Sequence, residues 1–398
     1  MAPEHAVVTR HPLQPFDARN FTPAPFSFDA AALAGAHALR GDRPPPPPFL
    51  PEPLPAEDLT TLDLDSLIRF VEHPARQFLR TRLQLTTTRE EEDPPESLPV
   101  SLEALDRWKV GDRVLRAVAA GTPLDRALAA ERARGGVPPG PLGDAPLGEV
   151  GADVVDLLRA AAPVLGTGPA DARDVTITLG DVVLGGTVGG LHGGGVVRVV
   201  FSKLAPKHRL RAWLQLLALA ADDTATSQPR GAQTIGRGGD GGVAVAALRR
   251  PDPEEARTLL GLVVDVYRRG MTTPLPFAAA TSHAYARARA AGKSPAGAEW
   301  PAGRAWSNWN NQQRRDLGEA GDAEHEQVWG AGAPLTTLLA IPPDPRLVPP
   351  PAARVLADAE QPLLSTLREE PHLFGQLARL VWEPLLAHET LRQIGGQP

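Results

Sequence analysis

One stretch decides the fold, DVTITLGDVVLGGTVGGLHGGGVVRVVFSK (residues 174–203), because it reads as three strands separated by two turns. Val175, Ile177 and Leu179 alternate with polar residues, as in a half-buried strand. A second apolar run begins at 182, after a turn at Gly180-Asp181, and a third covers 196–201, after a glycine-rich turn. The residues that follow, 204–221, predict a helix, because their apolar side chains recur at helical spacing. This apolar stripe consists of Leu210, Trp213, Leu214 and Leu217.

Further elements are predicted on both sides of this stretch. Residues 64–72 and 74–83 predict two helices, separated at His73-Pro74 because the residue before a proline avoids the α region. Helices are also expected near 102–118, 150–162 and 252–270, and a hairpin over 234–248. The residues between Gly135 and Gly148 are rich in glycine and proline and predict a loop.

Composition limits the class of protein. The chain has 398 residues, a net charge of −6 and no cysteine, which excludes disulfides and cysteine-ligated metal sites. No apolar run is long enough to cross a membrane, and the first residues lack the layout of a signal peptide. We therefore expect a cytoplasmic protein without membrane contact. Any nucleic-acid contact must be a local basic patch, because the chain as a whole is acidic.

Four segments are predicted along the chain. Residues 1–60 form an extended, proline-rich arm or linker that includes five consecutive prolines, Pro44–Pro48. A helical subdomain is expected over 61–135 and an α/β core over 136–270. Residues 271–398 are expected to mix helices with proline-rich loops, and they contain five of the seven tryptophans. Because tryptophan is enriched at interface hot spots, this segment is either a partner surface or core.

A helix, three meandering strands and a second helix form the core layout of the restriction-endonuclease-like, PD-(D/E)XK type of fold. Hydrolysis on that fold needs two carboxylates for magnesium and a lysine beside them. Here the middle strand offers Thr187 and Val188, and the last strand offers Val200, Phe201 and Ser202 before Lys203. None of these is a magnesium ligand of the required kind. We therefore predict a nuclease-like α/β core, embedded in helices, without its catalytic or metal site.

Other chemistries are less well supported. A divergent magnesium-dependent nuclease would have to use relocated carboxylates, for which Asp181, Asp222 and Asp223 are the available acids. His325 has acidic neighbours in DAEHEQVW (residues 322–329), which suggests either a metal cluster or a polar helix surface. The sequence contains no HExxH pair, GxSxG elbow or Walker motif, so metalloprotease, serine hydrolase and NTPase are not supported.

Four stretches resemble RecC, the gamma subunit of exodeoxyribonuclease V (RecBCD), in order and spacing. They are HPLQPFDARNF (11–21), LDSLIRFVEHPARQFLRTRL (64–83), SLEALDRWKVGDRVLRAVAAG (101–121) and YRRGMTTPLPF (267–277). The resemblance covers nearly all of this chain but only the C-terminal portion of a full-length RecC. It implies a non-catalytic scaffold with the fold of the RecB nuclease, in which Arg211 and Gln215 replace a glutamine and a tyrosine of the active enzyme.

The resemblance also implies partners and limits. It implies contact with RecB-like and RecD-like subunits and with double-stranded DNA ends or forks, in double-strand break repair by recombination. It implies no cofactor for this chain, whereas the partner subunits need ATP and Mg. The part of the family that reads the Chi sequence is not in this chain, which fits a fragment, a split gene or a truncated reading frame. A free-standing DNA-binding module is a third hypothesis.

Candidate DNA contacts are basic residues in two groups. The first lies at the junction between the last strand and its helix, and the second on the helix after His73. These candidates are Lys203, Lys207, Arg209 and Arg211 in the first group, and Arg76, Arg80 and Arg82 in the second. Solvated surface charge is the plain alternative for each of them.

Overall fold

The computed structural model describes residues 11–22, 27–41, 48–87, 101–166, 168–224, 228–239, 241–307, 318–347 and 360–395. The chain divides into two units, Met1–Pro51 and Glu52–Pro398. Most of the predicted proline run and the whole charged stretch EEEDPPE (90–96) lie outside the described residues. The predicted boundaries at 135 and 270 fall inside the larger unit and stay a prediction.

The smaller unit contains a short 3-10 helix, η2 (Ala18–Asn20), and the helix α1 (Ala30–Arg40). The side chain of Asp29 begins α1 by accepting hydrogen bonds from the backbone N–H groups of Ala31 and Ala32, which lack a helical partner. Buried Asn20 donates its side-chain amide to two backbone carbonyls, those of Gln14 and Pro15, at 3.0 Å each. These local bonds hold the turn before α1 together.

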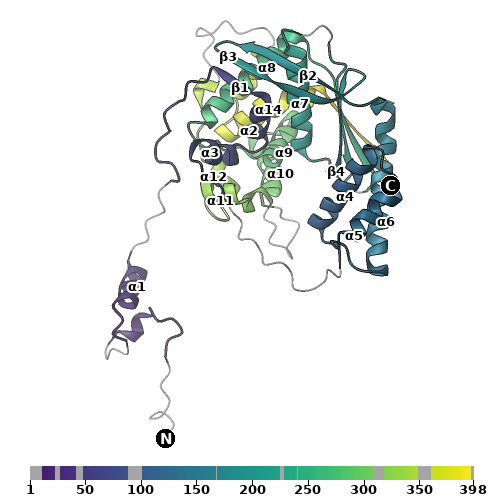
Figure 1. Ribbon diagram of the computed structural model, residues 1–398. Helices are drawn as coiled ribbons and strands as arrows, with labels where there is room; N and C mark the ends of the chain where they lie inside the picture. The colour runs from purple at the N-terminus through teal and green to yellow at the C-terminus, as the bar shows by residue number, and fades with distance from the viewer. Residues whose placement is uncertain are drawn as a thin grey trace. The chain divides into compact units, whose positions relative to one another are not determined.

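A seven-stranded mixed sheet forms the centre of the larger unit (Figure 1). Its strands are β1 (Thr61–Asp63), β2 (Asp171–Leu179), β3 (Val182–His192), β4 (Gly195–Lys203), β5 (Ala232–Arg237), β6 (Val243–Leu248) and β7 (Glu389–Ile394). The predicted three-strand meander is confirmed as β2, β3 and β4, and the predicted hairpin as β5 and β6. Strand β7, at the C-terminal end of the described residues, was not predicted.

Strands β3 and β4 diverge. Strand β2 pairs with β3 along nearly its whole length and so takes one edge of β3. On the other edge, β4 makes only two residue pairs, next to the turn at His192, and β1 pairs in parallel with residues 183–185. Since a strand has two edges, β4 must leave β3 beyond the turn. Strand β1 then takes the freed edge of β3, and β4 pairs with β5 instead.

Three helices cover one face of β4, β5 and β6. They are α4 (Ala104–Ala119), α5 (Leu124–Ala133) and α6 (Pro141–Leu165), which lie together beside β4 in Figure 1. Valines and leucines of α4 and α6 form a core with Val197, Phe201 and Ile235 of the sheet. The loop predicted for residues 135–148 is wrong from Pro141 onward. Buried Leu147 extends the apolar stripe of α6, and this burial outweighs the weak helix propensity of the nearby glycines and prolines.

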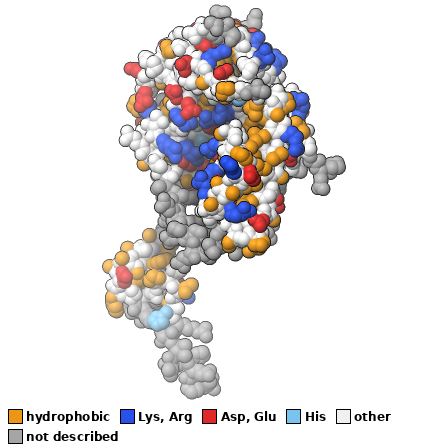
Figure 2. All heavy atoms as spheres, turned by 45° about the vertical axis from the view of Figure 1, so that its right-hand side comes forward, with side chains coloured by type: hydrophobic (Ala, Val, Ile, Leu, Met, Phe, Trp, Pro, Cys, Tyr) orange, Lys and Arg blue, Asp and Glu red, His pale blue; other side chains and the backbone are white. Residues whose placement is uncertain are grey.

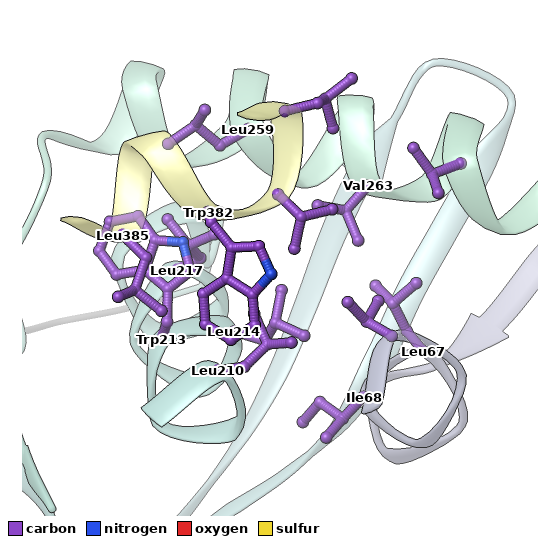
Figure 3. Close-up of a cluster of buried hydrophobic side chains, with 14 of the residues drawn as sticks. Leu67, Ile68, Leu210, Trp213, Leu214, Leu217, Leu259, Val263, Trp382 and Leu385 are labelled. Carbon is purple, nitrogen blue, oxygen red and sulfur yellow. The ribbon is translucent and has the colours of Figure 1, made fainter. Parts of the chain in front are cut away.

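A second helical layer covers the opposite face. It contains α2 (Leu64–Glu72), α3 (Pro74–Arg82), α7 (Pro206–Ala221), α8 (Pro253–Gly270), α9 (Ala279–Ala290) and α14 (Leu373–His388). The predicted break at His73-Pro74, helix α7 and the helix ending near Gly270 are confirmed. The predicted stripe of α7 packs between α8, α14 and α2 (Figure 3). Leu259 and Val263 of α8 and Trp382 and Leu385 of α14 meet it there.

Shorter elements complete the larger unit. They are α10 (Pro295–Ser307), η3 (Gly318–Gly321), α11 (Ala323–Trp329), α12 (Leu335–Leu339), η4 (Pro345–Leu347) and α13 (Glu360–Leu367). None of the described helices is long and apolar enough to cross a membrane. Among the C-terminal tryptophans, Trp306 and Trp382 are buried, Trp329 is half-buried and Trp300 is 66% exposed. Trp309 lies outside the described residues.

Candidate functional site

The strand positions that would hold magnesium in a nuclease of this layout are apolar or bonded elsewhere. Val188 and Phe201 are fully buried in the two hydrophobic cores. The hydroxyl of Thr187 donates to Asp174 on β2 at 2.6 Å, away from β4. Magnesium requires a shell of oxygen ligands, and two valines and a phenylalanine offer none. The residues of β3 and β4 therefore do not fit the metal site of a PD-(D/E)XK nuclease.

The three relocated carboxylates are separately engaged. Asp181, after β2, pairs with Arg268 at 2.7 Å, and that hydrogen bond lowers the pKa of its carboxyl group. The carboxylate of Asp222, after α7, accepts hydrogen bonds from the backbone N–H groups of Thr176 and Thr224, which lie in two different segments. Asp223 pairs with Arg257 at 2.5 Å. Each acid has a structural partner, so the structure does not favour a relocated magnesium site.

A polar cluster does lie where β4 faces α7. We call it the β4–α7 cluster and define it as Arg198, Ser202, His208, Arg211 and Gln215. Arg198 lies on β4 and donates to the side-chain oxygen of Gln215 on α7 at 3.1 Å. Ser202, four residues further along β4, lies on the same face of the strand and bonds to Nε2 of His208 at 2.8 Å. Both bonds link the last strand of the meander to the helix that follows it.

Sequence analysis missed Arg198. The sequence did contain a signal for this residue: it is a single charged side chain inside the apolar run VVRVVF (196–201), which predicts a buried strand. A charged residue is rarely buried without a reason, so such an exception is informative. The structure adds that Arg198 is partly buried and makes no ion pair with a carboxylate among the residues described.

The electrostatic environment of this cluster is positive. Burial lowers the pKa of His208 to about 4, and the charge of Lys207 acts in the same direction. His208 is therefore neutral at pH 7. Burial also lowers the pKa of Arg198, and the charge of nearby Arg211 lowers it further. Lysine and arginine side chains also gather across the middle of the larger unit on the face drawn in Figure 2.

Several predicted DNA contacts are bound to carboxylates instead. Nε of Arg209 donates to buried Glu389 of β7 at 2.6 Å, and both side chains are almost fully buried. Arg211 makes a two-bond ion pair with Glu72 of α2, at 2.7 and 2.8 Å, and this raises its pKa. Both charges are therefore neutralised within the protein.

The second predicted group of DNA contacts, on α3, contains two arginines that are bonded within the protein and one that is exposed. Arg76 donates to Glu324 of α11 at 2.8 Å. Arg82 donates to the carbonyl of Pro55 at 2.8 Å and lies near Glu57. Arg80, Lys203 and Lys207 are exposed and make no ion pair with any residue described. The structure thus brings Lys203 and Lys207 together at one junction and leaves Arg80 on a different helix.

The acidic neighbours of His325 lie in a second cluster, built with His73. Asp322 accepts a hydrogen bond from Nε2 of His73 at 2.9 Å, and His325 donates from Nδ1 to the carbonyl of Glu319 at 2.7 Å. One ligand atom from each of His73, Asp322 and His325 lies within 4.8 Å of the others. However, the two imidazole rings are stacked, with centroids 4.6 Å apart and planes 24° apart.

Stacking decides against a shared metal ion at this cluster. A ring nitrogen binds a metal through a lone pair in the ring plane, and two nearly parallel planes do not meet at one ion. Burial alone would raise the pKa of Asp322, but hydrogen bonds with His73 and Glu324 lower it overall. The cluster is best described as a polar junction that ties α3 to α11.

A family model matches more than half of this chain. The model is the RecC C-terminal domain, and it matches residues 59–290, from just before β1 to the end of α9. The match includes the diverging strands, the β4–α7 cluster and helix α8. It excludes the smaller unit and the C-terminal helices from α10 onward.

Curated relatives extend the similarity beyond that domain. The chain is 36% identical over 390 residues to the "RecBCD enzyme subunit RecC" of Mycobacterium tuberculosis, and 35% identical over 391 residues to that of Mycolicibacterium smegmatis. Both matches cover 96% of this chain and 33% of the relative. The Escherichia coli subunit is 27% identical over 272 residues, 67% of this chain and 22% of the relative. The chain thus spans about a third of the length of the mycobacterial relatives.

Proposed function

This chain belongs to the RecC family, and we propose that it is the C-terminal, non-catalytic part of a RecC-type subunit in a RecBCD-type helicase–nuclease, exodeoxyribonuclease V. Its role is to hold partner subunits and to handle DNA during double-strand break repair by recombination. The relatives are named as subunits of the RecBCD enzyme, which supports RecB-like and RecD-like partners for this chain. We place this assembly in the cytoplasm.

One observation carries the non-catalytic part of the proposal: apolar, buried side chains stand where a nuclease needs oxygen ligands. Val188 of β3 and Phe201 of β4 are each 0% exposed. Inserting a carboxylate at Val188 would bury a charge within an apolar core, at a cost of several kcal/mol. These positions therefore serve the folding of the sheet. The chain needs no cofactor of its own in this proposal, whereas ATP and Mg serve the partner subunits.

The proposed fold is a restriction-endonuclease-like core without its active site. Three meandering strands between helices, a last strand that diverges from the middle one and a lysine at its end support this assignment. The function itself is argued from the residues of the site, because one fold serves many functions.

Partner binding needs exposed surface, and the larger unit offers some on its outer helices. Exposed apolar residues lie on α4, α6 and α10. They are Leu105, Trp108, Leu142, Val155 and Trp300. Aromatic and aliphatic residues of this kind are common at the centre of protein interfaces. Of the C-terminal tryptophans that the structure describes, Trp300 is therefore the best candidate for a partner contact.

Copurification tests the assembly. The tagged chain should retain the RecB-like and RecD-like subunits of the same organism when all three are expressed together. Trp300→Ala should weaken this retention more than Trp306→Phe, because Trp300 is exposed, whereas Trp306 is buried and its substitution keeps an aromatic ring. Failure of the wild-type chain to retain either subunit would reject the proposed function.

A cleavage assay tests the alternative, a divergent magnesium-dependent nuclease. The purified chain should leave linear duplex DNA intact in magnesium. Cleavage that disappears in Asp181→Ala would reject the non-catalytic proposal. Asp156→Ala, which removes an exposed acid on α6 far from β4 in sequence, is the matched control.

A further inference from the structure

Arg198 differs from the arginines around it because it makes no ion pair with a carboxylate among the described residues. Its guanidinium donates a hydrogen bond to the Gln215 side chain, which carries no charge. Neighbouring Arg209 and Arg211 are each held by a glutamate, Glu389 and Glu72 respectively. Partly burying a guanidinium without a counter-ion costs free energy, and a bound anion would recover it.

The pKa of Arg198 is shifted in the opposite direction from that of several ion-paired arginines. The arginines at 76, 107, 113, 211 and 379 all have a raised pKa, and each makes hydrogen bonds with a carboxylate. Arg198 instead has a lowered pKa, with burial as the main cause. The Glu72 and Asp65 carboxylates act on it in the opposite direction, but they are already shared with Arg211.

Two further cations flank the same junction. Lys203 ends β4 and Lys207 lies in the first turn of α7. Both are exposed, and neither makes an ion pair with a described residue. The charge of Lys207 is close enough to lower the pKa of His208, as is that of Arg198. Lys207 and Arg198 therefore both lie close to His208, which bonds to Ser202.

We propose that Arg198, positioned by Gln215, binds a backbone phosphate of a DNA strand at the β4–α7 cluster. The inference rests on the proposed function, since it places DNA on this chain. The flat guanidinium of arginine presents paired donors that match phosphate oxygens. Lys203 and Lys207 then contact neighbouring phosphates of the same strand.

A DNA strand fits better than an acidic segment of a partner protein. The three cations are Arg198 and Lys203 of β4 and Lys207 of α7. A DNA strand carries one phosphate charge per nucleotide and so offers an anion to each of them. A protein segment would need several acidic residues at matching spacing. Phosphate contacts position a strand without reading its sequence, which suits a subunit that handles any DNA end.

Fluorescence anisotropy of the full chain with labelled single-stranded oligothymidylate tests the site. Arg198→Gln should weaken binding about tenfold and lower the slope of log K against log salt by roughly 0.7, the value of one contact on a single strand. Arg126→Gln is the control, because it removes an exposed cation of α5 that has no ion pair with a described residue. It should leave both the affinity and the slope unchanged.

A second measurement uses inorganic phosphate. Phosphate should raise the melting temperature of the wild-type chain above that in chloride of equal ionic strength, and this increment should disappear in Arg198→Gln. Gln215→Glu is the second variant, because it gives Arg198 an internal carboxylate. It should fold and should lose the same increment. A merely structural role for Gln215 would change stability but not the dependence on phosphate.

The outcomes separate this inference from the proposed function. Unchanged DNA affinity in both Arg198→Gln and Gln215→Glu overturns the phosphate site. Binding of labelled polyglutamate, but not of oligothymidylate, overturns it in favour of an acidic protein partner. If the chain copurifies with its partner subunits while these variants bind DNA normally, the proposed function stands and the inference falls.

Discussion

Phe201 of β4 lies directly against Gly111 of α4, so closely that a Cβ on Gly111 would stand 2.0 Å from Cε1 of the ring. The guanidinium of Arg237 lies 4.7 Å from the centre of the same ring. Phe201 occupies the position two residues before Lys203, where the nuclease layout needs an acid. If the proposed nuclease-like fold is correct, the side chain that attaches the α4 layer to the sheet stands in the place of a metal ligand.

Gly111→Ala should destabilise the chain by about 2 kcal/mol, because overpacking against a fixed aromatic ring costs more than the gain in helix propensity. Urea unfolding measures this change. Gly148→Ala in α6 is the matched control, since nothing lies within 4 Å of its Cβ position. The control should be neutral or slightly stabilising. Equal stability of the two variants would show that α4 does not pack on Phe201 in this way.

Glu389→Gln should lower the free energy of unfolding by about 3–5 kcal/mol, because it leaves the buried Arg209 guanidinium without its charge partner. The two side chains are 5% and 3% exposed. Asp156→Asn breaks the exposed pair with Arg159 on α6 and should cost less than about 1 kcal/mol. Thermal unfolding of both variants distinguishes them. A loss of stability below about 1 kcal/mol in Glu389→Gln would mean that Glu389 does not hold Arg209 in this way. Arg209 would then be available for the DNA contact that the sequence suggested.

The sequence predicts the sheet better than it predicts the site. Strands β2 to β4 and helix α7 follow from local periodicity, which depends on neighbours two to four residues apart. The absence of ligands is also local, because it concerns which residues stand beside Lys203. Both could be read without knowing the rest of the fold.

The partners of the basic residues could not be read in this way. Arg209 meets Glu389 across 180 residues of sequence, and Arg76 meets Glu324 across 248. Spacing along the chain carries no record of such pairs. Tertiary structure therefore decides which cations remain available for DNA.

Acid should destabilise the chain through His283 and His208. Burial lowers the pKa of His283 to about 3 and that of His208 to about 4, against about 6.5 for an unfolded histidine. Between these values the unfolded state binds more protons, so stability rises with pH and is lost on acidification below about 6.5. At pH 5 the loss should be about 2 kcal/mol for His283 and less for His208, which is more exposed.

Urea unfolding between pH 5 and pH 8 measures this effect. His283→Gln should flatten the dependence, because a glutamine side chain does not titrate and can still accept the hydrogen bond from Arg209. His37→Gln, on exposed α1, is the control and should leave the dependence unchanged. A profile of the wild-type chain that is flat from pH 5 to pH 7 would contradict the buried, neutral state of His283.

Zinc should not stabilise the junction of His73, Asp322 and His325, because the stacked rings do not converge on one ion. Asp322→Ala should lower the melting temperature by the same amount in EDTA and in excess zinc, since it breaks hydrogen bonds to His73 and to the start of α11. A zinc-dependent rise in melting temperature that is lost in Asp322→Ala would instead establish a metal site here.

Lys203→Ala combined with Lys207→Ala should weaken binding of the assembled complex to forked DNA by about tenfold. Both side chains are exposed and without an ion pair among the described residues, so each is free to displace a counter-ion from a phosphate. The slope of log K against log salt should fall by up to about 1.8, which corresponds to two lost contacts. Arg126→Ala should leave this slope unchanged, because it removes an exposed cation of α5 outside the β4–α7 cluster. A slope that responds to Arg126→Ala but not to the lysine pair would contradict the placement of the strand at the end of β4.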